Sequence, residues 1–294
     1  MPKFFQKFML LFILSIALGL AACTSESVTA SPFDPIVRMP EGNVVVTFID
    51  VGQGDATLIQ TNDGNMLIDG GLRSAYEHIL SILDQRGVTE LAYVVATHPH
   101  ADHIGGLTPL ISNNNGINVQ TVLMPNVVHT TRTYENFLEA LIDGNITVRE
   151  PYPGKQLALG DAIFTVLAPN SSGYNSLNNY SIVLHMTHGE NSFLFAADAE
   201  RESEEEILAT FDDISADVLR VGHHGSRTST TPDFLASIAP RYAIISAGYE
   251  NRYGHPHSVV IERLYSSVER IFRTYVYGDI TMTSDGTSIY IDYR

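Results

Sequence analysis

The chain has 294 residues, of which 44% are hydrophobic and 17% are charged, so it can bury a sizeable globular core. Its formal net charge is -16 at pH 7, because 33 acidic residues outnumber 17 basic ones. Such an acidic surface repels phosphate backbones at long range, which argues against tight, sequence-independent binding to nucleic acid. A local positive cleft remains compatible with this charge, since bound metal ions would create one.

The N-terminus has the pattern of a processing signal. Lys3 and Lys7 form a short positive region before an apolar stretch, 8–20, which is shorter than a typical membrane-spanning helix. The run Leu-Ala-Ala-Cys at 20–23 resembles the lipobox of bacterial lipoproteins, in which the signal is cut before the cysteine and the cysteine carries lipid. The alternative is an ordinary secretory signal with an incidental cysteine. Cys23 is the only cysteine, which excludes disulfides within the chain and thiolate zinc ligands.

These features predict a signal peptide at 1–22 and a lipidated Cys23 at the start of a flexible tether, 23–43. The tether is expected because the segment is rich in Ser, Thr and Pro and poor in apolar residues. We therefore expect an extracytoplasmic, membrane-anchored lipoprotein.

From residue 44 onward, short apolar runs alternate with runs of helical spacing. Strands are predicted over 44–50, 56–60, 65–69, 91–97, 121–124, 146–148, 163–167, 181–186, 193–197, 218–221, 242–246, 280–283 and 288–292. Helices are predicted over 75–86, 105–111, 134–143, 202–210, 232–238 and 258–268, with the acidic run 204–206 on the solvent side of its helix. No internal repeat or linker interrupts this pattern, so we expect one α/β domain, 44–294, built as a layered sandwich.

The strongest chemical signal is the segment His98-Pro99-His100-Ala101-Asp102-His103, which follows the predicted buried strand 91–97. Residues two apart on an extended segment point the same way, so His98 and His100 can share one ion. Asp102 and His103 lie past the bend and can reach a second ion. Imidazole nitrogen and carboxylate oxygen suit zinc, iron or manganese, so the spacing predicts a metal site.

This segment resembles the signature of the metallo-β-lactamase superfamily. Five further segments resemble, in collinear order, one branch of it: the C-terminal hydrolase domain of the competence protein ComEC and its free-standing relatives. They are 48–55 (FIDVGQGD), 67–71 (LIDGG), 197–200 (ADAE), 221–226 (VGHHGS) and 252–257 (RYGHPH). The resemblance covers roughly 44–292. It implies a single-domain αββα four-layer sandwich with a metal site at one edge, between two sheets.

The resemblance also implies a ligand set for two divalent ions, zinc or manganese. His98 and His100 would bind the first ion, and Asp102 and His103 the second. Asp198 would bridge both, and His223 or its neighbour His224 would supply the last histidine. The candidate catalytic residues are Asp102, His224 and His255.

One departure from the superfamily pattern concerns the first ion. The superfamily takes a third histidine from the loop before a central strand, but here that loop, 175–180, contains none. Asn178 or Asn179 would offer a weaker amide oxygen, or water would fill the place, which favours manganese or mixed occupancy. His185 and His188, farther along, are expected to be structural or surface residues.

Several other polar residues lie near glycines or close to these motifs. Asp50 and Asp69 are expected to position the metal-binding loop without binding metal themselves, with Asp69 accepting a hydrogen bond from a ligand histidine. Gln53 and Asp55 are interpreted as turn residues. His255 is either a proton donor to a leaving group or a residue that merely lines a turn. The candidate phosphate-binding residues are Ser226, Arg227, Arg252 and His257.

The expected activity is that of a metal-dependent hydrolase in which a metal-bridged hydroxide attacks a phosphodiester. The phosphodiester would be nucleic acid, a nucleotide or another phosphoester. Hydrolysis of a carbon ester or a β-lactam is the alternative within enzymes, since the fold supports several chemistries. A non-catalytic surface lipoprotein that keeps metal for structure is the alternative outside enzymes. No protein partner is predicted.

Overall fold

The computed structural model describes residues 42–112 and 115–293, which form one compact unit. The predicted signal peptide, the lipidated Cys23 and most of the tether lie outside the described residues. Within the described part of the chain, no helix is both long enough and apolar enough to cross a membrane.

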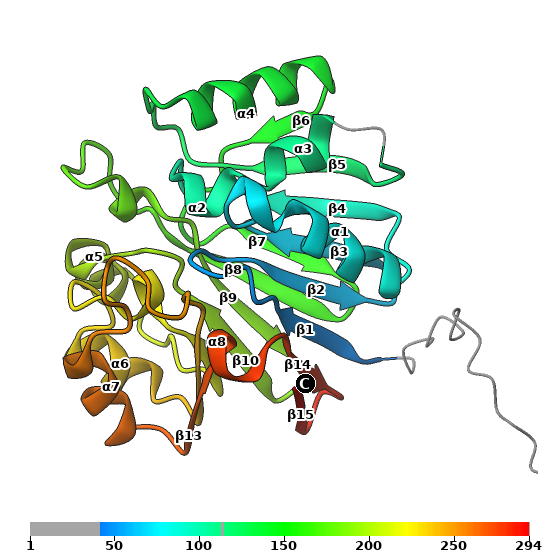
Figure 1. Cartoon of the computed structure of the whole chain (residues 1–294). Coiled ribbons are helices and arrows are strands. Elements are labelled where there is room, and N and C mark those ends of the chain that lie inside the picture. Colours follow the sequence, from blue (N-terminus) through cyan, green and yellow to red (C-terminus); the bar gives the residue numbers. More distant parts are fainter. Residues whose placement is uncertain (1–41, 113–114, 294) are drawn as a thin grey trace, which may run out of the picture. The chain divides into compact units, whose positions relative to one another are not determined.

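The strands form two sheets (Figure 1). The eight-stranded sheet has the order β15-β14-β1-β2-β3-β4-β5-β6, and the seven-stranded sheet has the order β13-β12-β11-β10-β9-β8-β7. The bounds in the first sheet are β1 (Val44–Phe48), β2 (Thr57–Thr61), β3 (Gly64–Ile68), β4 (Glu90–Val95), β5 (Asn118–Leu123), β6 (Thr147–Arg149), β14 (Ile280–Ser284) and β15 (Ile289–Tyr293). Those in the second are β7 (Gln156–Leu159), β8 (Ala162–Ala168), β9 (Val183–His188), β10 (Asn191–Phe195), β11 (Val218–Arg220), β12 (Tyr242–Ile245) and β13 (Arg270–Arg273).

The two sheets pack face to face because each strand sends alternate side chains to opposite faces. In β10, Phe193 and Phe195 enter the core between the sheets, whereas Leu194 enters the layer beneath the helices. Phe48 of β1 and Phe164 of β8 meet them in the same central core. Burial of each such phenylalanine side chain favours the folded state by about 1.5–3 kcal/mol.

Helices cover the two outer faces (Figure 1). Those over the eight-stranded sheet are α1 (Tyr76–Gln85), α3 (Leu107–Ser112) and α4 (Arg132–Asp143), and those over the seven-stranded sheet are α5 (Arg201–Thr210), α6 (Pro232–Ile238) and α7 (Ser258–Tyr265). Two short helices, α2 (Ala101–Ile104) and α8 (Thr274–Tyr277), complete the set. This arrangement is the predicted αββα sandwich in a single domain.

Several local predictions differ from the structure. The helix expected over 105–111 is replaced by α2 and α3, which Gly105 and Gly106 separate. A Cβ atom on Gly106 would lie 2.1 Å from the Gly70 carbonyl oxygen, so only glycine allows this close approach. The elements β7, β13 and α8 were not predicted.

Glu204 corrects the expectation that the acidic run 204–206 faces solvent. Its side chain is fully buried, and its carboxylate accepts hydrogen bonds from the backbone N–H groups of Thr230 (2.5 Å) and Thr231 (2.8 Å). These donors lie at the N-terminus of α6, whose unpaired N–H groups favour a carboxylate. Glu204 therefore anchors the loop that follows His223 and His224.

Candidate metal centre

The residues with metal-ligand chemistry gather at the carboxyl ends of three parallel strands. His98 and His100 follow β4, Asp198 follows β10, and His223 and His224 lie in a tight turn, Gly222–Gly225, after β11. The carboxyl ends of parallel strands are where α/β sheets place their functional loops. The two sheets thus present their loops to one another at the same edge.

The first candidate ligand pair comes from the segment after β4. The Nε2 atom of His98 and the Nδ1 atom of His100 lie 3.0 Å apart, and Oδ2 of Asp198 lies 3.7 Å from His98 Nε2. Burial lowers the pKa of His98 well below its usual value and also lowers that of His100. Both imidazoles therefore favour the neutral form that binds metal.

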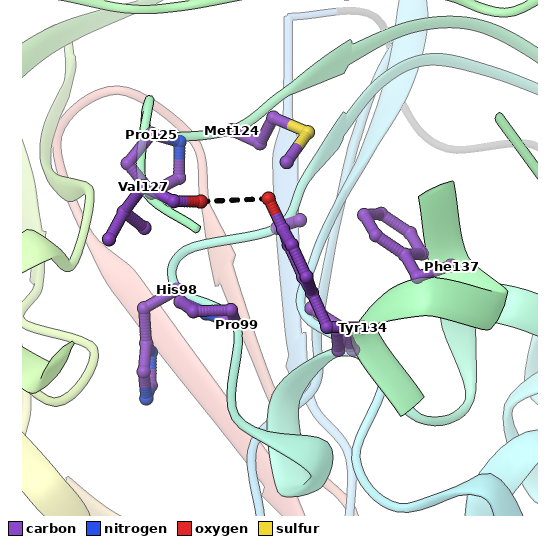
Figure 2. A pocket seen from close by; sticks show the side chains of 9 residues that line it. His98, Pro99, Met124, Pro125, Val127, Tyr134 and Phe137 are labelled. Carbon is purple, nitrogen blue, oxygen red and sulfur yellow. Dashed lines mark hydrogen bonds between the residues drawn. The ribbon is translucent and has the colours of Figure 1, made fainter. Parts of the chain in front are cut away.

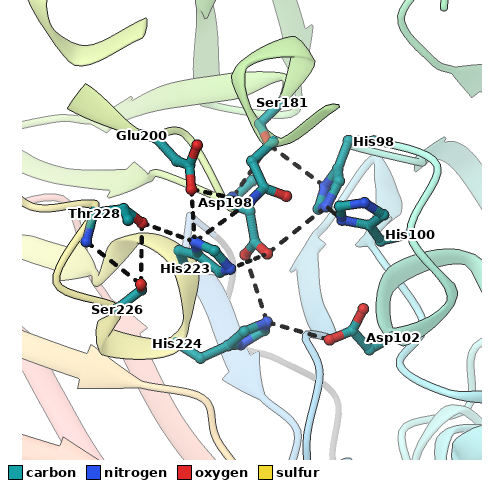
Figure 3. A network of polar contacts seen from close by, with 12 residues as sticks. His98, His100, Asp102, Ser181, Asp198, Glu200, His223, His224, Ser226 and Thr228 are labelled. Carbon is teal, nitrogen blue, oxygen red and sulfur yellow. Dashed lines mark hydrogen bonds and ion pairs between the residues drawn. The ribbon is translucent and has the colours of Figure 1, made fainter. Parts of the chain in front are cut away.

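The second candidate set consists of Asp102, His103 and His224, whose ligand atoms lie within 4.8 Å of one another. His224 Nε2 is 3.6 Å from Oδ2 of Asp102 and 3.5 Å from Oδ1 of Asp198, so it faces both carboxylates (Figure 3). His103 Nε2 is 3.3 Å from Oδ2 of Asp198. The structure thus places His224, and not His223, in this set.

These residues fit divalent ions. Among the described residues, three buried atoms of this cluster lack a hydrogen-bond partner: His103 Nε2, His224 Nε2 and Asp198 Oδ1. An unsatisfied buried polar group costs about 1–3 kcal/mol, so a shared partner such as a metal ion would relieve several costs at once. Burial raises the pKa of Asp198, but the charges of His224 and His103 outweigh it and hold that pKa well below its usual value. Asp198 is therefore an anionic candidate ligand that faces both sets.

The Nδ1 atom of each histidine in the second set is held by a hydrogen-bond partner. His103 Nδ1 lies 2.7 Å from Asp69 Oδ2, and Asp69 also accepts hydrogen bonds from the N–H (2.9 Å) and hydroxyl (2.7 Å) of Thr97. The contact predicted for Asp69 is thus present. His224 Nδ1 lies 2.9 Å from the Ser246 carbonyl oxygen, so Nδ1 carries the proton and Nε2 is left to face the cluster.

Asp50 does not share this position. Its backbone N–H donates to Asp279, and its carboxylate accepts a hydrogen bond from the N–H of Gly52 at 3.2 Å, which is a turn contact. The bracing role expected for Asp50 is therefore not what its contacts show.

His223 lies on the open side of Asp198, where 20% of its side chain is exposed. Its Nδ1 atom is held by the Thr228 hydroxyl (3.2 Å) and the Glu200 carboxylate (3.5 Å), while its Nε2 atom is 3.6 Å from Asp198 Oδ2. Burial raises the pKa of Glu200, but hydrogen bonds led by that from His223 bring it down to about 2. Sequence analysis gave no role to Glu200, although it ends the motif 197–200, or to Thr228, which lies outside every quoted motif.

The loop that lacks the superfamily's third histidine contains two buried asparagines. Both polar atoms of the Asn179 side-chain amide have hydrogen-bond partners. The oxygen accepts from the Glu200 N–H and the nitrogen donates to Glu202, both at 3.0 Å. The Asn178 side chain donates to Glu200 at 3.2 Å, and its Oδ1 atom has no hydrogen-bond partner among the described residues. Of the two alternatives, Asn178 is the one with a free amide oxygen.

A cavity of about 920 Å³ opens over the cluster. Of the predicted substrate and catalytic residues, Arg252, His255, His224 and Asp102 line it. Ser226, Arg227 and His257 do not: Ser226 is buried against Thr228 (3.0 Å), and the Arg227 N–H donates to His257 (3.1 Å). Sequence analysis gave no site role to several other lining residues, among them Leu72, His129, Tyr249 and Tyr253, of which only Tyr253 lies in a quoted motif.

His129 is carried by the loop between β5 and α4. Its ring centroid lies 5.8 Å from that of His100. Figure 2 shows Tyr134 reaching from α4 past Pro99 to the Val127 carbonyl, to which its hydroxyl donates at 2.7 Å. Apolar packing around this hydroxyl contact therefore holds the His129 loop beside the segment that bears His98 and His100.

A four-layer αββα sandwich with a histidine–aspartate cluster at its strand ends defines a class of metal-binding proteins, most of them hydrolases. The family model of the metallo-beta-lactamase superfamily matches residues 49–249, and the chain belongs to that superfamily. It is accordingly a metal-dependent hydrolase by family, with a fold that binds divalent metals.

Two curated relatives and one solved structure support this placement. The chain is 34% identical over 253 residues to ComE operon protein 3 of Bacillus subtilis, covering 80% of this chain and 32% of that protein. It is 29% identical over 250 residues to competence protein ComA of Neisseria gonorrhoeae, covering 82% and 32%. The chain thus spans about a third of the length of these relatives, as the resemblance to one hydrolase domain implied. The metallo-beta-lactamase fold protein YhfI of Bacillus subtilis shares the fold, with a TM-score of 0.52 at 12% identity over 78% of this chain and 95% of that one.

Proposed function

We propose that the protein is a hydrolase that uses two metal ions to cleave phosphodiesters. The carrying observation is that two ligand sets converge on the Asp198 carboxylate. His98, which pairs with His100, lies near Oδ2 of Asp198; in the set of Asp102, His103 and His224, His103 also lies near Oδ2 and His224 lies near Oδ1. Two divalent ions in these sets would supply an activated water and stabilise the negative charge that develops at phosphorus. His98, His100 and His103 would hold the ions, and Asp198 would supply the shared anionic ligand.

The cavity rim favours a phosphodiester that carries a planar group, as a nucleotide or nucleic acid does. Tyr249 is 73% exposed and Tyr253 is 47% exposed, although both are large aromatic side chains beside the cluster. The Arg252 guanidinium lies 4.8 Å from the Tyr253 ring centroid and adds a positive charge to an otherwise acidic chain. Aromatic rings stack on bases and arginine binds phosphate oxygens. The likeness to a competence protein supports the same substrate class.

Hydrolysis of bis(4-nitrophenyl) phosphate by the purified full chain tests this proposal. We expect turnover with zinc or manganese, and loss of activity to background when a chelator removes the metal, because the two ligand sets would then lack their ions. Activity should return when either metal is restored. Parallel assays with 4-nitrophenyl acetate and a chromogenic β-lactam distinguish the alternatives. Cleavage of either of these, with no phosphodiester turnover in any metal, would overturn the assignment.

We also propose that the protein is a membrane-anchored, extracytoplasmic lipoprotein. The support is the lipobox-like run at 20–23, with the sole cysteine at the position that receives lipid. Cys23→Ser removes the thiol, so the protein should leave the membrane fraction or keep its signal uncut. Immunoblots of fractionated cells measure both, with Thr24→Ala as the neighbouring control that stays in the membrane. A Cys23→Ser protein that is processed and fractionates like the parent would contradict the proposal.

A further inference from the structure

A buried ion pair lies directly behind the candidate metal centre. Arg220 of β11 is 1% exposed, and its Nη2 atom lies 2.5 Å from Oδ2 of Asp55, which is 3% exposed. This corrects the interpretation of Asp55 as a turn residue. Removing two charges from water is costly, and a buried pair contributes little net stability compared with apolar side chains of similar size. The pair therefore needs an explanation other than stability.

The Arg220 guanidinium is hydrogen-bonded to the backbone that carries the candidate ligands of the seven-stranded sheet. Its Nη1 atom donates to the carbonyl oxygens of Ala197 (2.8 Å) and Val221 (2.9 Å). Ala197 directly precedes Asp198 and has a φ of +46°, a left-handed conformation that L side chains seldom adopt without support. Arg220 thus fixes the positions from which Asp198 and His224 extend.

Asp55 is hydrogen-bonded to the backbone of the segment that carries the candidate ligands of the eight-stranded sheet. Its backbone N–H donates to the Asp102 carbonyl oxygen at 3.1 Å, and its own carbonyl oxygen accepts from Gly71 at 2.8 Å. A Cβ atom on Gly54 would lie 2.4 Å from the same Asp102 oxygen, so the glycine in the motif 52–55 lets the two loops touch. A displacement of Asp55 would therefore carry Asp102 with it.

We propose that the Asp55–Arg220 pair is a brace between the two sheets that sets the spacing of the second ligand set. Asp102 and His103 belong to one sheet, and Asp198 and His224 to the other. Figure 3 shows Asp102 and His224 facing one another from different loops, with His224 also facing Asp198. Both members of the pair are positioning residues, since neither faces the cavity. The inference rests on the two-ion centre of the proposed function, and its predicted consequence is selective loss of the second ion.

The test is the paired variant Asp55→Leu with Arg220→Met, which removes both charges and leaves neither one buried alone. Calorimetric titration of manganese into the metal-free full chain should show the first ion bound as in the parent. Binding of the second ion should weaken about 10- to 100-fold, the range typical of residues that orient metal ligands. The variant Arg220→Lys keeps the positive charge but lacks the two guanidinium nitrogens that contact Asp55 and Ala197 together. It should therefore also bind the second ion more weakly than the parent.

His188→Leu is the matched control. His188 is buried on β9, and its Nδ1 atom lies 2.7 Å from the hydroxyl of Ser284 on β14, so this contact also links the two sheets, but at the opposite end of β9 and β10 from Asp198. Its loss should lower stability and leave both affinities at the parental values. A parent that binds no ion would refute the proposed function itself. A parent and a folded paired variant with equal affinities for two ions would refute the brace. If the paired variant does not fold, parental affinity in Arg220→Lys refutes it.

Discussion

Replacement of Asp102 by alanine is expected to abolish phosphodiester hydrolysis while the fold survives. Asp102 lies in the short helix α2 outside the apolar core, and its Oδ2 atom is 3.6 Å from His224 Nε2. Burial raises the pKa of Asp102, but the hydrogen bond from His224 and the charge of His103 outweigh it and keep the carboxylate ionised. The substitution removes this anionic ligand from the second set. A loss of about 1,000-fold or more in kcat, equivalent to about 4 kcal/mol, would follow.

Steady-state assays, circular dichroism and elemental analysis of the same preparation measure this outcome. His185→Ala is the control, because His185 lies on β9 and its Nε2 atom is 2.8 Å from the Ser215 carbonyl oxygen, outside the ligand cluster. This variant should retain parental turnover. A folded Asp102→Ala protein with parental kcat would show that the second ligand set has no part in the reaction.

The fold was predictable because its determinants are local. Period-2 alternation in segments such as β14, and the continuous apolar run of β10, identify half-buried and buried strands without knowledge of their neighbours. The metal segment after β4 was equally accessible, since residue types and spacing alone bring His98 and His100 together. The missed strands β7 and β13 lie at sheet edges, where fewer apolar positions face a core and the alternation is weaker.

The rest of the site depends on contacts between residues far apart in the sequence. The partners Asp55 and Arg220 are separated by 165 positions, and no local pattern marks an arginine within the apolar strand β11 as the buried partner of a turn carboxylate. Glu204 was misplaced for the same reason: a run of three glutamates is typical of a solvated helix face, and only the packing of α5 against the start of α6 buries one of them. The choice between His223 and His224 was open because adjacent residues share every local signal.

That choice can be decided by a matched pair of substitutions, and His224→Asn should have the larger effect. Both histidines have left-handed backbones, with φ of +49° and +55°, a conformation that asparagine adopts more readily than most residues. The amide nitrogen of asparagine occupies about the place of Nδ1, so at position 224 it can still donate to the Ser246 carbonyl. Only the Nε2 atom that faces Asp102 and Asp198 is lost.

We therefore expect His224→Asn to release one of two ions and to lower kcat about 1,000-fold, or about 4 kcal/mol, in a folded protein. His223→Asn should retain both ions, because the His223 Nε2 atom faces the cavity side of Asp198 and lies outside the set formed by Asp102, His103 and His224. Elemental analysis after dialysis measures the stoichiometry of each variant. Loss of an ion from His223→Asn, with two retained in His224→Asn, would reverse the assignment. It would mean that the turn Gly222–Gly225 presents its first histidine to the metal once the ions bind.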